Sequence, residues 1–428
     1  FTSAAALAIL AYFYLLRPQT PAMPLIVAEG ALLGLLALLS VGAVLFILVS
    51  LAALLFARES APWKNRLRGQ MIFLLSALLI LTTLVGVSQL RAHTPAITGP
   101  EGAPLPNSIA SLERVRLGGV DQWLIIRGED VNKPVLLFLS GGPGASEAGR
   151  VLRFNQELEK HFVVVIWEQR GCGKSYPSLN PREDLTVEQY AKDIVELSEL
   201  LRARFDEDKI YLVGHSWGTI PSVRAVQARP DLFHAYVGSA QMVDVLETDH
   251  LIYDMVMERS RQSGDSQFVQ TLEKQGRPPY TGKNPIVSYA TLFGREYQLF
   301  EVPNIKNRDY LQNGDVLFMM LKQPEYGWLD RIYFLLGMLN TFNVVYPQLQ
   351  DMDYRLDATH FEVPVYLMLG RHDMNNPPVI PQEYFDLLEA PRKELIYFEE
   401  SGHGMIWEEA DLFHQILIEK VLPETYQP

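Results

Sequence analysis

The most constraining feature of the sequence is a short apolar run that leads directly into a Gly-x-Ser-x-Gly motif. Residues 210–213 have the composition of a buried strand, the motif occupies 214–218 with Ser216 at its centre, and residues 220–229 have a helical composition that ends before Pro230. A sharp strand-to-helix turn exposes the serine hydroxyl and needs glycine where a β-carbon would clash. Such a motif also occurs by chance in loops, so its interpretation depends on the rest of the chain.

The first 91 residues have the composition of a membrane region. Apolar runs cover 1–16, 24–56 and 71–90, and the whole region holds only six Lys/Arg and two Asp/Glu. Because a bilayer core needs about 20 apolar residues per helix, we expect three transmembrane helices, with Glu29 at an interface before a buried stretch at 31–56. A cleaved signal peptide explains the first run only, and a buried helical hairpin is the soluble alternative.

Loop charges predict the orientation of these helices. The connection between the second and third runs carries four basic residues, against Arg17 alone in the first connection; they are Arg58, Lys64, Arg66 and Arg68. Basic residues favour the cytoplasmic side, so the sequence predicts an integral membrane protein with a cytoplasmic N-terminus and an extracytoplasmic domain after residue 91. Gly30 and Gly34 form a G-x-x-x-G pair that would allow a homo-oligomer through these helices, although coincidence explains the pair equally well.

The remaining residues hold most of the 50 acidic side chains of the chain, which argues against a nucleic-acid partner. The single cysteine, Cys172, excludes an internal disulfide framework. Residues 92–107 have the composition of a linker. We expect a first α/β core segment at 108–243, a helical lid at 244–359, and a second α/β core segment at 360–428.

The two core segments alternate strands and helices. Two alternating runs around Gly118 and Gly119 predict a hairpin, and later apolar runs predict strands buried on both faces. This order is typical of an α/β fold with a mostly parallel sheet covered by helices on both faces. The expected strands are 134–139, 162–167, 210–213, 234–237, 363–369 and 395–398, and the expected helices are 186–204, 220–229, 381–388 and 411–421.

Three residues have the chain order of a serine, acid and base triad. Ser216 would be the nucleophile, Asp373 follows the strand at 363–369, and His403 follows the strand at 395–398. All three positions fall at the same edge of a parallel sheet. Other candidates are weaker: they are Asp351 and Asp353 for the acid, and His250, His360 and His372 for the base.

The turn Gly141-Gly142-Pro143-Gly144 follows the strand that supplies an oxyanion donor in this architecture. Pro143 has no N–H, so Gly142 is the expected donor, together with the N–H of Trp217. Residues 168–171 are interpreted as scaffold, and Cys172 as a buried, inert thiol or a reactive thiol near the pocket. No metal-ligand spacing and no phosphate-binding loop is present, so we expect neither a metal nor a cofactor.

These motifs resemble those of the prolyl aminopeptidases (proline iminopeptidases), a family of α/β-hydrolases. The resemblance is carried by residues 141–144, 168–175, 214–218, 370–373 and 402–404. It implies an α/β-hydrolase fold with a lid, in which Ser216, Asp373 and His403 form the triad and Gly142 and Trp217 the oxyanion hole. The sequence departs from the family at Ser140, Glu168 and His215, where His, Asp and Gly are usual, which leaves the proline preference open.

Three functions follow from these observations. The first is a membrane-tethered serine aminopeptidase acting on short peptides, whose lid carboxylate would bind the substrate ammonium group; the candidates are Glu247, Glu296 and Glu301. The second is an esterase, lipid hydrolase or amide hydrolase acting on acyl substrates near the bilayer, because the lid is rich in Met, Phe and Tyr. The third is an inactive hydrolase fold used for binding.

Overall fold

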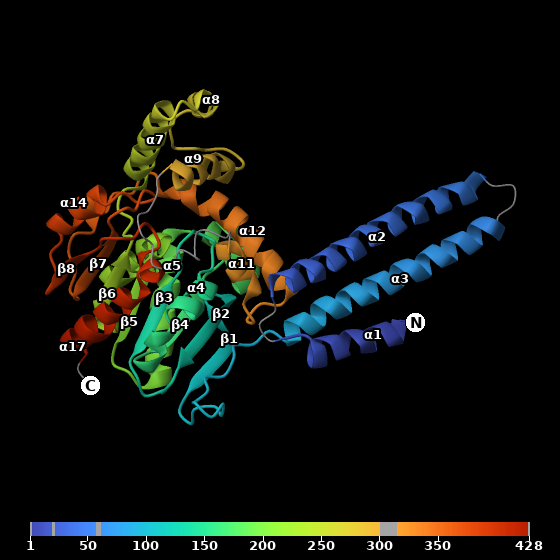
Figure 1. Ribbon diagram of the computed structural model, residues 1–428, viewed down its shortest axis with the longest axis horizontal. Coiled ribbons are helices and arrows are strands. Elements are labelled where there is room, and N and C mark those ends of the chain that lie inside the picture. The colour runs from blue at the N-terminus through green and yellow to red at the C-terminus, as the bar shows by residue number, and fades with distance from the viewer. Residues whose placement is uncertain (1, 19–21, 57–60, 300–314, 427–428) are drawn as a thin grey trace. The chain divides into compact units, whose positions relative to one another are not determined.

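The computed structural model describes residues 2–18, 22–56, 61–299 and 315–426 (Figure 1). The chain divides into two compact units. One consists of Phe1–His93 with the short segment Leu321–Arg331, and the other of Thr94–Met320 with Ile332–Pro428. The segment Leu321–Arg331 therefore belongs to the same unit as the N-terminal helices, although it lies within the residues expected to form the lid.

The N-terminal unit is built from apolar helices. Two of them, α2 (Met23–Phe56) and α3 (Ala61–Leu90), are long and apolar enough to cross a membrane. The first predicted span is shorter, because α1 (Thr2–Ala11) continues only through a π-helical stretch, Tyr12–Leu16. The described residues thus give two helices of membrane length rather than the expected three.

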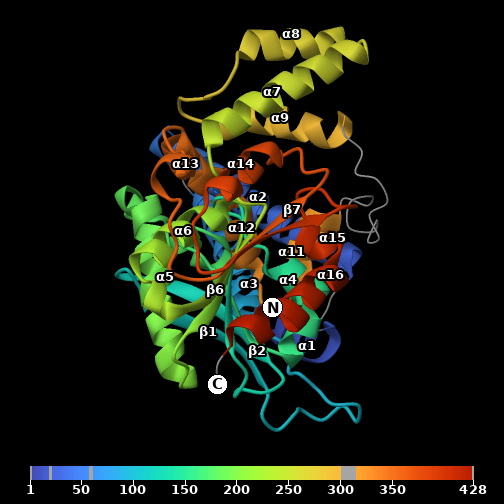
Figure 2. The same ribbon diagram turned by 90° about the vertical axis from the view of Figure 1, so that its left-hand side faces the viewer.

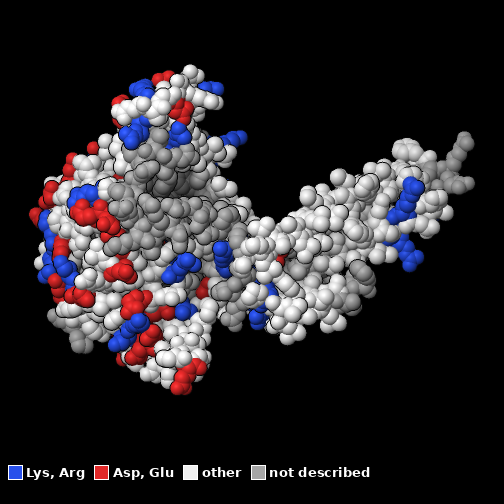
Figure 3. Space-filling model, viewed as in Figure 1, with Lys and Arg blue, Asp and Glu red and all other residues white. Residues whose placement is uncertain are grey.

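Charged groups are scarce on these helices (Figure 3). One group of them lies at the start of α3, and another lies around Glu29. Lys64, Arg66 and Arg68 lie in the first turns of α3, which begins earlier than expected, and Arg58 lies outside the described residues. Glu29 accepts hydrogen bonds from Arg17, from the Tyr12 hydroxyl and from the Trp328 indole. Because Gly30 faces the Trp328 ring, whose nearest atom would lie 2.9 Å from an added β-carbon, this glycine contacts an aromatic ring within its own chain.

The second unit contains one eight-stranded sheet with the order β1-β2-β4-β3-β5-β6-β7-β8. The predicted hairpin is confirmed as an antiparallel pair, Leu117 facing Val120 at the turn, and β3 to β8 run parallel to one another. The strands are β1 (Ile109–Leu117), β2 (Val120–Gly128), β3 (Val135–Leu139), β4 (Val163–Glu168), β5 (Ile210–His215), β6 (Phe233–Ser239), β7 (Val365–Gly370) and β8 (Lys393–Phe398).

Helices cover both faces of this sheet, as Figure 2 shows. One apolar cluster packs α5 (Val187–Phe205) and α6 (Thr219–Ala228) on one face of the strands. A second cluster packs the opposite face against α4 (Ala148–Phe154), α15 (Met405–Glu408) and α16 (Ala410–Gln415). Because β3, β4 and β5 are buried on both faces, their sequences read as continuous apolar runs rather than alternating ones.

Between β6 and β7 the described residues form mainly helices. Those of the lid region are α7 (Val245–Gln262), α8 (Ser266–Gln275), α9 (Pro285–Leu299), α11 (Asp315–Lys322), α12 (Trp328–Val345) and α13 (Tyr354–Asp357). An aromatic ring of α9 packs against rings of α12 and of the 3₁₀ turn that follows it (Tyr346–Leu349). The ring centroid of Tyr289 lies 5.7 Å from that of Phe342 and 4.7 Å from that of Tyr346. These rings form a core of the lid itself. Between β7 and β8 lies α14 (Val379–Leu387). After α16 the chain continues through a π-helical stretch, Ile416–Val421, into α17 (Leu422–Thr425).

Candidate active site

The turn after β5 holds Ser216 in a strained backbone conformation. Its φ angle is 52°, in the left-handed region that residues other than glycine rarely adopt. Both flanking glycines are sterically required: a β-carbon at Gly214 would lie 2.9 Å from the Gly218 carbonyl oxygen, and one at Gly218 would lie 2.5 Å from that of Leu139. The close approach of these segments explains the Gly-x-Ser-x-Gly spacing.

The structure brings Ser216, His403 and Asp373 together. Ser216 Oγ lies 3.0 Å from His403 Nε2, and His403 Nδ1 lies 2.9 Å from Asp373 Oδ2. A carboxylate can only accept, so Nδ1 of His403 carries the hydrogen and Nε2 is free to accept the Ser216 proton. This is the arrangement that activates a serine nucleophile.

Asp373 is held in place by the turn that follows β7. Its side chain is buried, and its Oδ1 accepts hydrogen bonds from the N–H groups of Asn375 and Asn376 at 3.0 and 2.8 Å. Backbone donors of this kind stabilise the negative charge of a buried carboxylate. His403 comes from the loop after β8, so both residues reach Ser216 from the carboxyl ends of neighbouring parallel strands.

The alternative acids and bases named from the sequence contact groups other than Ser216. Asp353 caps α13 and pairs with Arg355, and Asp351 lies beside it in the lid region. His250 bonds the Pro278 carbonyl through Nε2, and His360 is exposed near Glu389.

The turn after β3 contains Gly142, the residue predicted to be an oxyanion donor. The Gly141 N–H donates to Glu147 Oε2 at 2.8 Å, so Gly142 offers the next N–H in the turn. A β-carbon at Gly142 would lie 2.8 Å from the backbone nitrogens of Gly144 and Ala145, and its φ is 129°. Gly142 and Trp217 as oxyanion donors remain a prediction that this geometry allows.

Residues after β4 tie the neighbouring loops together. Gln169 donates from Nε2 to the Ser140 carbonyl and accepts from the Trp217 indole at 2.9 Å, which links the oxyanion turn to the residue after the nucleophile. Arg170 and Asp193 form a fully buried ion pair at 2.9 Å. Arg170 also donates to the Gly118 carbonyl, and Asp193 accepts from Gln122. The sequence interpretation of 168–171 as scaffold agrees with these contacts.

Two buried acidic groups beside the site have raised pKa values. Burial raises the pKa of the Cys172 thiol well above its usual value, which keeps it protonated and unreactive. Burial likewise raises the pKa of Glu408 to about 7, although its carboxylate accepts the Gly402 N–H at 2.7 Å. Glu408 thereby anchors the loop that carries His403.

The three lid carboxylates proposed for amine binding have different positions. Glu247 accepts a hydrogen bond from Arg355, so the negative charge of Glu247 is already compensated. Arg355 also pairs with Asp244 and Asp353. Glu296 lies in α9, but its side chain is outside the described residues, as is the whole of Glu301. Among the described residues no group of three or more His, Cys, Asp or Glu side chains could hold a metal ion.

Two residues beside the site that sequence reasoning did not assign are Glu147 and His215. They lie 68 positions apart, and His215 Nδ1 is 3.0 Å from Glu147 Oε2. The sequence contained one signal for them: His215 stands where the resembling family has glycine. A buried imidazole beside the nucleophile needs polar partners, and Glu147 is the carboxylate nearest to the oxyanion turn in sequence.

Comparison with known proteins agrees with this architecture. A family model described as the alpha/beta hydrolase fold matches residues 134–410, so the chain belongs to the α/β-hydrolase family. Within it, the chain is similar to proteins named as aminopeptidases: it is 34% identical over 314 residues to the probable aminopeptidase YbaC of Bacillus subtilis, covering 73% of this chain and 97% of that protein.

Two further similarities point the same way. The chain is 23% identical to a proline iminopeptidase of Thermoplasma volcanium, covering 71% of this chain and 94% of that protein. The crystal structure of a proline iminopeptidase-related protein from Thermus thermophilus matches with a TM-score of 0.50 at 20% identity, covering 74% of this chain and 98% of that one. At this identity the structural match supports the fold alone. The family resemblance inferred from the motifs is confirmed, and with it the class of serine hydrolase.

Proposed function

We propose that this chain is a membrane-anchored serine aminopeptidase that removes N-terminal residues from short peptides. The observation that carries the proposal is the continuous chain of contacts from Ser216 Oγ through His403 to Asp373. Relatives named aminopeptidase and proline iminopeptidase support the choice of an amide with a free amine as substrate.

The contacts support an acyl-enzyme mechanism. Ser216 Oγ attacks the carbonyl carbon of the substrate's first residue while His403 Nε2 accepts the hydroxyl proton, and the N–H groups of Gly142 and Trp217 stabilise the oxyanion. Collapse of the tetrahedral intermediate breaks the C–N bond, and His403 gives the proton to the leaving amine. Water then attacks the acyl-enzyme with His403 again as base, which releases the amino acid and restores Ser216.

Recognition of a free amine requires a carboxylate near the scissile bond. Arg355 already compensates Glu247, so Glu296 and Glu301 are the better candidates in the lid. We expect Glu296→Gln or Glu301→Gln to raise KM for substrates with a free amine more than for N-acetylated ones.

The activity can be tested with the full chain purified in detergent. Aminoacyl and prolyl chromogenic amides should release their amine, and the same compounds with an acetylated N-terminus should react far more slowly. Hydrolysis of acyl esters without turnover of any aminoacyl amide would support the esterase instead. Failure of a fluorophosphonate to label Ser216 would support a binding protein without catalysis.

Anchoring and orientation form the second part of the proposal. The basic residues Lys64, Arg66 and Arg68 lie at the start of α3, whose length suffices to cross a bilayer. Since basic flanks favour the cytoplasm, the chain would leave α3 at Leu90 on the extracytoplasmic side. This orientation does not depend on whether α1 spans the membrane, because it follows from α3 alone.

Labelling of engineered cysteines tests the orientation. In a Cys172→Ala background, the variant Lys133→Cys, at an exposed position, should react with an impermeant maleimide in intact cells. The variant Arg66→Cys should react only after the membrane is opened. The reverse pattern would contradict the proposed orientation, and equal reaction of both in a soluble fraction would contradict anchoring.

A further inference from the structure

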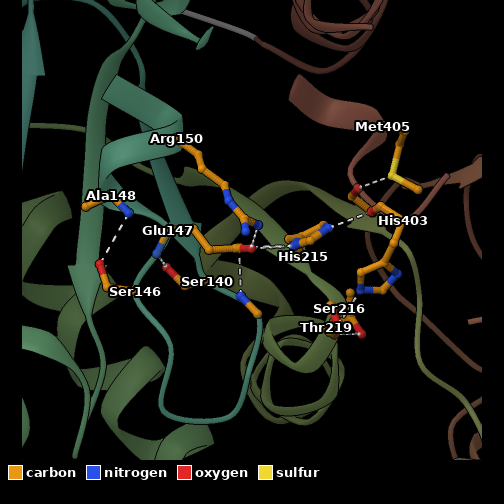
Figure 4. A network of polar contacts seen from close by, with 12 residues as sticks. Ser140, Ser146, Glu147, Ala148, Arg150, His215, Ser216, Thr219, His403 and Met405 are labelled. Carbon is orange, nitrogen blue, oxygen red and sulfur yellow. Dashed lines mark hydrogen bonds and ion pairs between the residues drawn. The ribbon is translucent and has the colours of Figure 1, made fainter. Parts of the chain in front are cut away.

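Both ring nitrogens of His215 are engaged, as Figure 4 shows. Nδ1 lies 3.0 and 3.2 Å from the two carboxylate oxygens of Glu147, and Nε2 lies 3.0 Å from the backbone carbonyl oxygen of His403. The two side chains are 2% and 6% exposed, so water does not compete for these contacts. The imidazole ring also packs edge-on against Trp407, with 4.7 Å between ring centroids.

These partners determine which protons His215 carries. A backbone carbonyl only accepts hydrogen bonds, so Nε2 must hold a hydrogen. Glu147 also accepts from the Gly141 N–H at 2.8 Å and from Arg150 at 3.1 Å, which favours its ionised form. An ionised carboxylate is again an acceptor, so Nδ1 must hold a hydrogen as well. With Glu147 ionised, these contacts require a doubly protonated, cationic His215.

The charge of Glu147 agrees with this assignment. Burial alone would raise the pKa of Glu147, but the charges and hydrogen bonds of His215, Arg150 and Gly141 together hold this pKa below its usual value. Burial of an ion pair is tolerated when further hydrogen bonds satisfy its remaining atoms. The Gly141 and Arg150 donors do so for the carboxylate, and the His403 carbonyl does so for the imidazolium.

We propose that His215 is a positioning residue, held as an imidazolium by Glu147, that fastens the loop of the base His403 to the oxyanion turn and opposes protonation of the His403 ring. The proposal rests on the function proposed above, in which His403 acts as the base. The connection runs from Gly141 through Glu147 and His215 to the His403 carbonyl, and it passes directly beside Ser216.

The electrostatic part follows from the distance between the two imidazoles. Their ring centroids are 5.2 Å apart, and a like charge at such a distance disfavours a second one. His403 therefore stays neutral, and able to accept the Ser216 proton, to a lower pH than it would beside a neutral residue. Among the described residues, Arg150 adds to this effect, whereas the negative charges of Glu147, Asp373 and Glu408 oppose it.

The variant Glu147→Gln tests the charge while keeping the shape. Its amide oxygen can still accept from Gly141, and its NH₂ group can donate to Nδ1, which leaves His215 neutral with its Nε2 hydrogen still on the His403 carbonyl. Glu159→Gln is the matched control. Glu159 is another buried carboxylate paired with an arginine, Arg127, and it lies in a separate contact before β4.

Nitrogen NMR of the full chain with ¹⁵N-labelled histidine rings gives a readout that does not require activity. The His215 signals are assigned by their loss in His215→Gln, and those of His403 by their loss in His403→Gln. In the parent near neutral pH, both His215 ring nitrogens should be protonated, and in Glu147→Gln only one. The pH midpoint of the His403 signals should rise in Glu147→Gln, by less than the loss of a lone positive charge would produce, because the Glu147 charge is lost as well. It should stay unchanged in Glu159→Gln.

The rate of fluorophosphonate labelling of Ser216 against pH gives the functional readout. Its acidic limb should move upward by the same interval in Glu147→Gln, whereas a merely structural role would lower the rate equally at every pH. A singly protonated His215 in the parent, or coincident His403 midpoints in parent and Glu147→Gln, would overturn the inference. An unlabelled parent would instead refute the proposed function, and the NMR result on His215 and His403 would still decide the inference.

Discussion

Ser216 and His403 are 187 positions apart in the chain, yet the serine Oγ lies 3.0 Å from the imidazole Nε2. The contact exists because β5 and the strands β7 and β8 run parallel in one sheet, so that the loops following them meet at one edge. Ser216 reaches this edge through a strained turn with φ of 52°. Strain at a buried serine beside a histidine is the structural basis for expecting catalysis there.

Removal of the Ser216 hydroxyl should abolish turnover. For Ser216→Ala we expect kcat/KM on aminoacyl amides to fall by about 10⁶-fold, because the hydroxyl that forms the proposed acyl-enzyme is removed. Fluorophosphonate labelling should disappear as well. Ser198→Ala is the control, since Ser198 is a buried helical serine of α5 that bonds only the Ile194 carbonyl in the described structure. Activity retained in Ser216→Ala would show that another nucleophile acts.

Replacement of Asp373 by asparagine should leave the fold intact and impair the base. An amide NH₂ would donate to His403 Nδ1, so the ring would carry its hydrogen on Nε2 and could not accept the proton of Ser216. We expect kcat to fall by about 10⁴-fold, as measured with a chromogenic amide. The exposed Asp386 of α14 provides the control Asp386→Asn. Equal losses in the two variants would contradict the role of Asp373.

A β-carbon at Gly142 should disturb the oxyanion donor. Gly142→Ala would place the new atom 2.8 Å from two backbone nitrogens at a φ of 129°, so the turn must shift. Loss of one oxyanion donor lowers kcat by about 10² to 10³-fold, with less effect on KM. Gly102→Ala is the control, because Gly102 also has a positive φ but no atom within 4 Å of an added β-carbon. A kcat unaffected by Gly142→Ala would assign the donor elsewhere.

Sequence patterns predicted most strands of the sheet and the three residues that contact one another at the candidate active site. The apolar runs at β3, β4 and β5 are continuous because these strands are buried on both faces. Ser216, Asp373 and His403 could be selected because each follows a predicted strand, and parallel strands bring such positions to one edge. Their catalytic roles stay predictions until the variants above are measured.

Contacts between side chains from distant segments were not predictable in the same way. The His215–Glu147 pair depends on where the loop before α4 folds back onto β5, which no periodicity encodes. Glu247 looked like a free lid carboxylate, but Arg355, 108 positions later, compensates it. The first apolar run looked long enough for a span, whereas its regular α-helix ends at Ala11 and a π-helical stretch follows.

A buried carboxylate in the lid region should make the stability of the chain depend on pH. Asp249 of α7 accepts hydrogen bonds from the hydroxyls of Tyr289 and Tyr346, at 2.8 and 2.7 Å. Burial raises its pKa to about 7, although these hydrogen bonds lower it in part. Above about pH 4 the unfolded chain releases this proton while the folded chain keeps it until about pH 7, so the unfolded state binds fewer protons and stability falls as pH rises.

The variant Asp249→Asn should remove this contribution. The free energy of unfolding of the parent should fall relative to the variant by up to about 1.4 kcal/mol per pH unit between about pH 4 and pH 7. Melting curves of the full chain at about pH 5 and about pH 8 measure this, and the stability of the variant relative to the parent should be greater at the higher pH than at the lower one. Asp254→Asn, an exposed position on the same helix, is the control. A difference between Asp249→Asn and parent that is the same at both pH values would mean that Asp249 is already ionised in the folded chain at about pH 5, with Tyr289 and Tyr346 stabilising its charge.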